Sequence, residues 1–276
     1  MLGSFLITTI RGVPIRLHFT ALFLLPWVHG QVGNPLTTLL ISALILASVA
    51  LHELGHTLVS QRYGVEVEDI LLTPIGGMAR LRGIPKDPRH EIRIALAGPY
   101  VSLFLAVVGF LVTLGELQLG IQPLFFVWLA GLNLMLFLFN LLPSFPMDGG
   151  RILRGCLTRS KGALEATRLA AKIGKYMSIA FIVLGLSSGN LSLALVGLFI
   201  MMSAGSEYRM MQLKHLREQQ VGGGSVSAGE AHFNASPPPY ASAHAPKLPD
   251  NLLGDILITF RDLYQEVYST CFRSGR

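Results

Sequence analysis

Long apolar runs decide what this chain can fold into. The run PLTTLLISALILASVA contains no charged residue, and only 14% of the 276 residues are charged, against about 25% in a soluble domain. A helix needs about 20 apolar residues to span a bilayer. Apolar segments, three of them short for a span, lie at roughly 17–29, 36–61, 94–114, 123–142, 172–187 and 190–206. We therefore expect an all-α, multi-pass membrane protein with about six transmembrane helices.

The basic residues lie on alternate connections between these segments. They precede the first segment, lie between the second and third and between the fourth and fifth, and follow the sixth. The other connections, GQVGNP, GELQLGIQP and SSGN, contain none. By the positive-inside rule, both termini are cytoplasmic. The pattern accounts for the net charge of +6 without nucleic acid. We expect a cell-membrane protein, of a bacterial inner membrane, in contact with the lipid bilayer and with no nucleic acid; the oligomeric state stays open.

Two further kinds of structure are expected around the helical core, residues 1–208. GVEVEDILLTPIGGMARLRGIPKDPRH alternates in polarity and predicts two or three short β-strands at the cytoplasmic interface; FLITTIRGVPIRLHF could add another. Residues 209–249 are expected to form a disordered linker, because the stretch is rich in Gly, Ser, Ala and Pro. Apolar spacing in residues 250–276 predicts an amphipathic helix.

Two histidines and a glutamate stand in the oily second segment, in LHELGHTLVS. His52 and His56 are four residues apart, so they share one face of a helix, and Glu53 lies beside His52. This is the H-E-x-x-H arrangement of zinc hydrolases, which combines two ligands with a general base. Ionisable side chains are costly in a membrane span. The cluster therefore indicates a bound metal rather than an uncompensated group.

A catalytic zinc needs a third protein ligand and an open position for water. The candidate is Asp148 in FNLLPSFPMDGGR, where two prolines and a Gly-Gly pair interrupt the helix. The second and fourth segments run in the same direction, and both sites fall on the cytoplasmic half, so the side chains can meet. The alternative is that Asp148 is the N-cap of a helix starting at GGRILRGCL.

Four stretches together resemble the site-2 protease family, the membrane-embedded zinc metalloproteases of peptidase family M50. They are LHELGHTLVS, LTPIGGMARL, IALAGPYVSL and FNLLPSFPMDGGRILR. The resemblance implies one zinc ion per chain, held by His52, His56 and Asp148, with Glu53 as the general base. No stretch resembles an inserted PDZ domain, and the tail is too short for paired CBS domains. We therefore expect the simple microbial branch of the family.

The resemblance also points to residues around the zinc ligands. Asn140 is expected to face the site and position the substrate; the alternative is an interhelical hydrogen bond. The family usually has Asn where this chain has Ser102, so an amide contact there is in question. Gly76 and Gly77, in a strand-like loop, are expected to position the substrate by strand addition.

The implied function is intramembrane proteolysis. Such an enzyme hydrolyses a peptide bond in or near a transmembrane segment of another membrane protein, in regulated intramembrane proteolysis, with its active site towards the cytoplasm. One alternative is a membrane metal transporter or sensor that uses the same His and Asp residues. A transporter needs no glutamate next to the first histidine and often shows internal repeats, which this sequence lacks. An inactive relative that binds membrane proteins ranks last, because every required residue is present.

Overall fold

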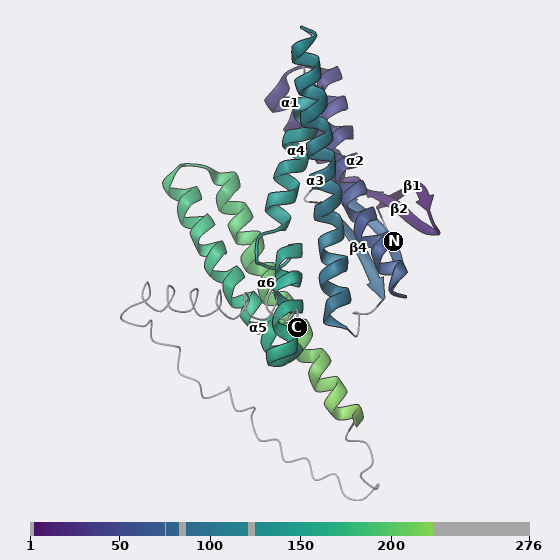
Figure 1. Cartoon of the computed structure of the whole chain (residues 1–276). Coiled ribbons are helices and arrows are strands. Elements are labelled where there is room, and N and C mark those ends of the chain that lie inside the picture. The colour runs from purple at the N-terminus through teal and green to yellow at the C-terminus, as the bar shows by residue number, and fades with distance from the viewer. Residues whose placement is uncertain (1–2, 75, 83–86, 121–124, 223–276) are drawn as a thin grey trace, which may run out of the picture. The chain divides into compact units, whose positions relative to one another are not determined.

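The structure is a computed structural model that describes residues 3–74, 76–82, 87–120 and 125–222 (Figure 1). Its helices are η1 (Phe19–Phe23), α1 (Leu24–Val32), α2 (Pro35–Arg62), α3 (Pro88–Gln118), α4 (Phe125–Asn140), α5 (Asp148–Ser187) and α6 (Leu191–Gly222). Residues Met1–Tyr208 group into one compact unit, which contains the site described below.

Four of the described helices are long and apolar enough to cross a membrane. They are α2, α3, α5 and the part of α6 from Leu191 to Arg217. The expected segments at 17–29 and 123–142 form shorter apolar helices, Phe19–Val32 and Phe125–Asn140. The mostly helical membrane protein is thus confirmed, whereas a total of about six spans stays a prediction.

Local sequence fixes where the two central helices begin. The Asn34 side chain accepts hydrogen bonds from the backbone N–H groups of Leu36 and Thr37, and Pro35 occupies the first turn of α2. Asp87 caps α3 in the same way through the N–H of Arg89, ahead of Pro88. These caps satisfy backbone donors that have no partner inside the helix.

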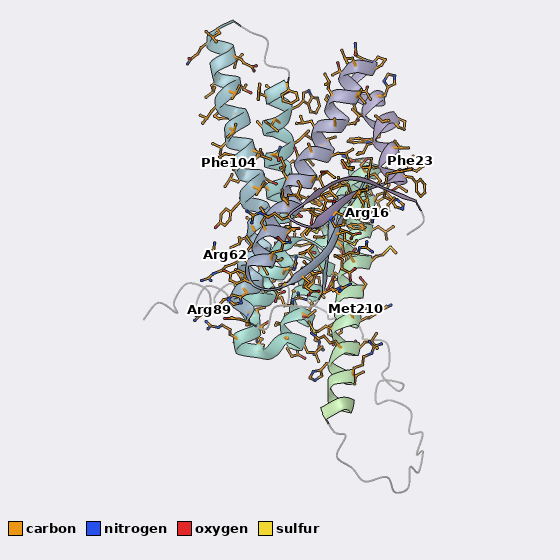
Figure 2. The ribbon with its side chains drawn as sticks, turned by 90° about the vertical axis from the view of Figure 1, so that its right-hand side faces the viewer. Arg16, Phe23, Arg62, Arg89, Phe104 and Met210 are labelled. Carbon is orange, nitrogen blue, oxygen red and sulfur yellow. The ribbon has the colours of Figure 1, made fainter. Side chains whose placement is uncertain are left out.

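Large apolar side chains point outward from the helices, as expected for lipid-facing surfaces. Phe104 of α3 is 64% exposed and Phe23 is 66% exposed. The buried residues of α2 include Thr38, Ser42 and Ser48, together with both histidines. Figure 2 shows Arg62 where α2 ends and Arg89 where α3 begins, away from Phe104 in the middle of α3.

A four-stranded sheet lies beside α2 (Figure 1). Its strands, in spatial order, are β1 (Ser4–Ile10), β2 (Val13–His18), β3 (Glu66–Thr73) and β4 (Gly76–Arg82). β1–β2 and β3–β4 pair antiparallel, and β2–β3 pair parallel. Of the two or three strands expected after α2, two are present among the described residues, and the N-terminal stretch supplies two strands rather than one. Leu46, Val49 and Ala50 of α2 pack on a buried cluster of the sheet, which consists of Val13, Ile15, Ile70 and Leu72. This core fixes the sheet to the part of α2 just before His52.

Helix α6 continues to Gly222, past residue 209, where a disordered linker was expected to begin. No glycine or proline interrupts residues 209–221, and Met210, Leu213 and Leu216 keep the stretch compatible with a helix. The rest of the expected linker and the expected helix at 250–276 lie outside the described residues.

Candidate metal centre

Three ligand atoms from two distant parts of the chain converge inside the compact unit. His52 Nε2 and His56 Nε2, on one face of α2, lie 3.1 Å apart. Asp148 Oδ2, at the first residue of α5, lies 3.2 Å from His52 Nε2 and 3.1 Å from His56 Nε2. All three side chains are buried. The structure therefore brings together the three residues that the sequence predicts as ligands.

Helix α3 forms hydrogen bonds with the Nδ1 atoms of both histidine rings. His56 Nδ1 donates a hydrogen bond to the carbonyl oxygen of Ile94 at 2.7 Å, and His52 Nδ1 hydrogen-bonds with Ser102 Oγ at 2.8 Å. A carbonyl can only accept, so His56 carries a proton on Nδ1, and the neutral ring then offers the lone pair of Nε2 to a metal. Contacts of this kind orient metal-binding histidines and select the tautomer.

The donor set fits a zinc ion. Two imidazole nitrogens and a carboxylate oxygen face one point, and such electron-pair donors attract a cation and repel each other. Ligands of a tetrahedral zinc with bonds of about 2.0–2.1 Å lie ~3.3 Å from one another. The observed separations of 3.1 to 3.2 Å are close to that value. Three protein ligands leave a fourth position open, as in catalytic zinc sites.

The loop before α5 places Asp148. Residues 141–147 fold back so that the carbonyls of Leu141 and Leu142 lie against Gly149, where a Cβ atom would collide with them. Gly150 packs in the same way on Ser144 and Phe145. The N-cap of α5 is Met147, and Asp148 is the first helical residue. The alternative that Asp148 is the N-cap is therefore wrong, because its side chain faces the two histidines instead.

The side chain of Glu53, a residue of α2, reaches the edge strand β4 of the sheet. Its Oε2 accepts a hydrogen bond from the backbone N–H of Ala79 in β4 at 3.3 Å. Gly77, two residues earlier, lies so close that a Cβ atom there would collide with the Glu53 side chain. The backbone of β4 therefore holds the carboxylate of Glu53 beside the centre.

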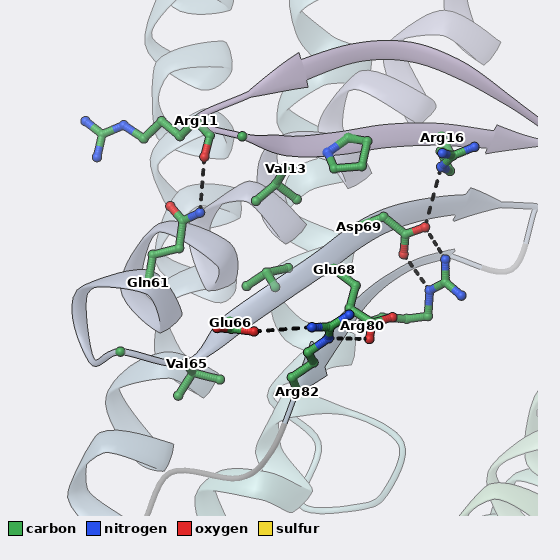
Figure 3. A pocket seen from close by; sticks show the side chains of 14 residues that line it. Arg11, Val13, Arg16, Gln61, Val65, Glu66, Glu68, Asp69, Arg80 and Arg82 are labelled. Atoms are coloured by element: carbon green, nitrogen blue, oxygen red, sulfur yellow. Dashed lines mark hydrogen bonds and ion pairs between the residues drawn. The ribbon is translucent and has the colours of Figure 1, made fainter.

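Ion pairs between neighbouring strands hold β4 in its position in the sheet (Figure 3). The buried Asp69 of β3 pairs with Arg16 of β2 at 3.6 Å and with Arg80 of β4. Arg82 pairs with Glu68 at 2.7 Å and with Glu66 at 3.5 Å. These pairs join three adjacent strands, so the position of β4 beside Glu53 is tied to the whole sheet.

Two other predicted site residues have different surroundings. Asn140, the last residue of α4, donates from Nδ2 to the carbonyl of Leu136 in its own helix at 3.0 Å, which is the only hydrogen bond of its side chain within the described residues. Within the described part of the chain, no hydrogen bond joins it to the three ligands. Gly76 has a φ of 145°, a conformation that side-chain-bearing residues rarely adopt, and open space beside it.

Sequence reasoning missed most of the contribution of α3. Gly98 packs directly on the Nε2 atoms of His52 and His56, and a Cβ atom there would collide with both. Ile94 acts through its backbone carbonyl, which no sequence pattern reports. The stretch IALAGPYVSL carries Gly98 and Ser102, and their spacing of four residues along one helix face was the available signal for these two residues.

Replacing Ser102 with Ala is expected to weaken metal binding. The buried hydroxyl orients the His52 ring, so its loss should raise the zinc dissociation constant by about 10- to 100-fold. Competition with a chromophoric chelator on detergent-purified protein measures this constant. The exposed Ser206, which donates to the carbonyl of Ser203 in its own helix, is the control position for Ser→Ala. Equal zinc affinity in the two variants would contradict the role given to Ser102.

Comparisons with known proteins agree with this geometry. The model of peptidase family M50 matches residues 40–120 and 116–185. A zinc metalloprotease of Methanocaldococcus jannaschii is 42% identical over 208 residues, which are 74% of this chain and 60% of that protein. The protein Rip3 of Mycobacterium tuberculosis is 35% identical over 231 residues, 78% of this chain and 53% of Rip3. The chain thus spans little more than half the length of these curated relatives.

A solved structure matches as well. The site-2 protease from Methanocaldococcus jannaschii aligns with a TM-score of 0.59 and 42% identity, over 74% of this chain and 95% of that one. The segments matched by the family model include residues 40–62 of α2 and the start of α5, which carry the convergent ligand atoms, and all of α3. The chain therefore belongs to peptidase family M50, the site-2 protease family.

Proposed function

We propose that this protein is a zinc metalloendopeptidase that cleaves a peptide bond in or near a transmembrane segment of another membrane protein. The observation that carries the proposal is the convergence of His52, His56 and Asp148, with Glu53 held beside them by the backbone of β4. Ligands alone would suit a transporter, but a fixed carboxylate next to the ligands is what hydrolysis requires.

In the proposed reaction, three residues bind the metal and a fourth transfers the proton. His52, His56 and Asp148 would hold the zinc, which would supply Lewis-acid chemistry: a lower pKa for water, about 7, and a polarised carbonyl group. Glu53 takes the proton of the attacking water and delivers it to the leaving amine. The Ala79 N–H that bonds Glu53 Oε2 keeps the carboxylate oriented for both transfers.

The position of the centre along α2 suggests where hydrolysis takes place. His52 lies ten residues before the end of α2 at Arg62, about 15 Å at 1.5 Å per residue. The basic residues at this end support a position on the cytoplasmic side by the positive-inside rule. Water would reach the zinc from the cytoplasm, and both chain termini would lie on that side. We infer a role in regulated intramembrane proteolysis at a cell membrane, with the bacterial inner membrane as the expected location.

The open edge of β4 is the surface we assign to the substrate. β4 is the last strand of the sheet, and Ala79 on its open edge bonds to the proposed base. A helical substrate hides its amides in hydrogen bonds, so it must unwind before attack. An unwound segment could pair with the edge at Gly76 and Gly77 by strand addition and lie across the centre. Asn140, at the end of α4, would hydrogen-bond to the same segment after a change of rotamer.

Replacing Gly77 with Val should impair cleavage more than folding. The new side chain collides with Glu53 and displaces its carboxylate, and a misplacement of about 1 Å costs about 100-fold in rate. Turnover of a labelled, helix-destabilised transmembrane peptide measures the effect, alongside zinc content and the thermal midpoint. Gly131→Val, where a Cβ meets open space, is the control. Unchanged turnover in Gly77→Val would remove β4 from the proposed mechanism.

Zinc content tests the ligand set. Elemental analysis of detergent-purified protein should find about one zinc per chain in the wild type. Asp148→Ala and His56→Ala should each lose it, because two remaining ligands hold zinc weakly. A wild type that lacks zinc, or an Asp148→Ala variant with unchanged affinity, would overturn the assignment. Zinc flux into proteoliposomes without peptide cleavage would favour the transporter instead.

A further inference from the structure

A buried ion pair links α3 to α5 close to the centre. Arg154 donates from Nε to Glu91 Oε1 at 2.8 Å, and its Nη2 group contacts the same oxygen. Glu91 is only 4% exposed and Arg154 only 6%. The mechanism proposed above uses neither residue.

Both partners stand next to parts of the centre. Glu91 lies one helical turn before Ile94, whose carbonyl holds His56. Arg154 lies in α5, six residues after Asp148, and its guanidinium sits 5.3 Å from the ring centre of Phe145. Phe145 is buried in the loop that folds back on Gly150. The ion pair therefore connects the helix that supports the histidines to the loop and helix that carry Asp148.

The packing around the pair leaves little freedom for α5 to shift. Gly155, the next residue after Arg154, lies so close to α3 that a Cβ atom would come within 2.6 Å of Ile92 Cγ1 and 3.2 Å of the Pro88 carbonyl oxygen. Close backbone approach sets the distance between the two helices. The rigid fork of the guanidinium then sets their rotation and register, because its N–H groups have fixed directions.

Stability alone does not account for such a pair. Removing two charges from water is costly, and apolar residues of similar volume often stabilise a fold as well or better. A buried pair can instead select one arrangement of the elements that it joins. Zinc affinity depends on such an arrangement, since Asp148 belongs to α5 and the histidines are oriented by α3.

We propose that the Glu91–Arg154 ion pair positions Asp148 against His52 and His56 and thereby sets the affinity of the centre for zinc. The inference rests on the proposed zinc site. Glu91 and Arg154 are positioning residues, which act through Phe145, Ile94 and the start of α5 and do not touch the metal.

The test compares single and paired replacements in full-length protein in detergent. Arg154→Lys keeps the charge but loses the planar fork, and Glu91→Gln keeps the shape but loses the charge. The double replacement of Glu91 by Leu and Arg154 by Met supplies apolar packing without directional bonds. Each variant should raise the zinc dissociation constant by about tenfold. The visible spectrum of the Co²⁺-substituted protein should shift in each, because cobalt bands report ligand geometry.

A control and a stability measurement separate positioning from folding. Arg168→Gln breaks an exposed ion pair with Glu165 in the same helix and should leave zinc affinity unchanged. Without metal, the thermal midpoint of the double variant should be near that of the wild type. Added zinc should raise this midpoint less than it raises the midpoint of the wild type. Wild-type affinity and cobalt spectra in Arg154→Lys and in the double variant would overturn the inference. If the double variant does not fold, Arg154→Lys and Glu91→Gln decide. A wild type that binds no zinc would instead reject the proposed function.

Discussion

Replacing Glu53 with Gln should abolish peptide cleavage while leaving zinc in place. The three ligands belong to other residues, and glutamine has nearly the same shape, so the centre keeps its geometry. The amide cannot take a proton from water or return it to the leaving amine. General acid–base catalysis contributes about 10²- to 10⁴-fold, and we expect the turnover of the labelled transmembrane peptide to fall by at least about 1,000-fold.

The position of the hydrogen bond to β4 sharpens this expectation. In the Glu53→Gln variant, Ala79 N–H can still donate to the amide oxygen of the new side chain, which therefore stays in place. A loss of cleavage then reports the missing base rather than a displaced side chain. Elemental analysis should still find about one zinc per chain.

The matched control is Glu165→Gln, an exposed glutamate of α5 far from the centre in sequence. It should keep both zinc and full turnover. Cleavage by Glu53→Gln at a tenth of the wild-type rate or faster would mean that another group is the base. Loss of zinc in Glu53→Gln would mean that Glu53 is a ligand rather than a base.

The sequence predicts the parts of the centre that follow from helix periodicity and from the free-energy cost of charged side chains in lipid. Four-residue spacing places His52 and His56 on one face, and the cost of charges in lipid indicates a cation for them to share. Asp148 follows from the break at Pro143, Pro146 and the Gly-Gly pair together with the direction of the helices. The structure has all three ligand atoms within 4.8 Å of one another.

Other parts of the centre could not be predicted from one sequence. The Ile94 carbonyl has no side-chain signature, and Gly98 reads like any small residue in a helix that packs closely. The parallel pairing of β2 with β3 joins residues more than fifty positions apart, so no local pattern reports it. Helix α6 extends to Gly222 because residues 209–221 contain no Gly or Pro, whereas the expected core ended at residue 208, just after the last apolar segment.

Replacing Gly98 with Ala should prevent zinc from binding at the metal centre. The added Cβ would fall 2.6 Å from His52 Nε2 and closer still to His56 Nε2, the two atoms that bind the metal. Gly55 of α2 already packs on the Ala97 carbonyl of α3, so the helices cannot separate without losing that contact. The rings must therefore rotate out of position.

We expect the zinc dissociation constant of Gly98→Ala to rise by at least about 100-fold, at the upper end of what changes around a metal site cause. Cleavage should fall to background with it. Gly115→Ala lies in the same helix and its Cβ meets open space, so it should keep zinc and cleavage. It should also keep or raise the thermal midpoint, because Ala favours a helix over Gly by up to about 1 kcal/mol. Full zinc binding by Gly98→Ala would show that α3 lies farther from the histidines than this structure has it, and the support given to both rings by Ile94 and Ser102 would then need to be reassigned.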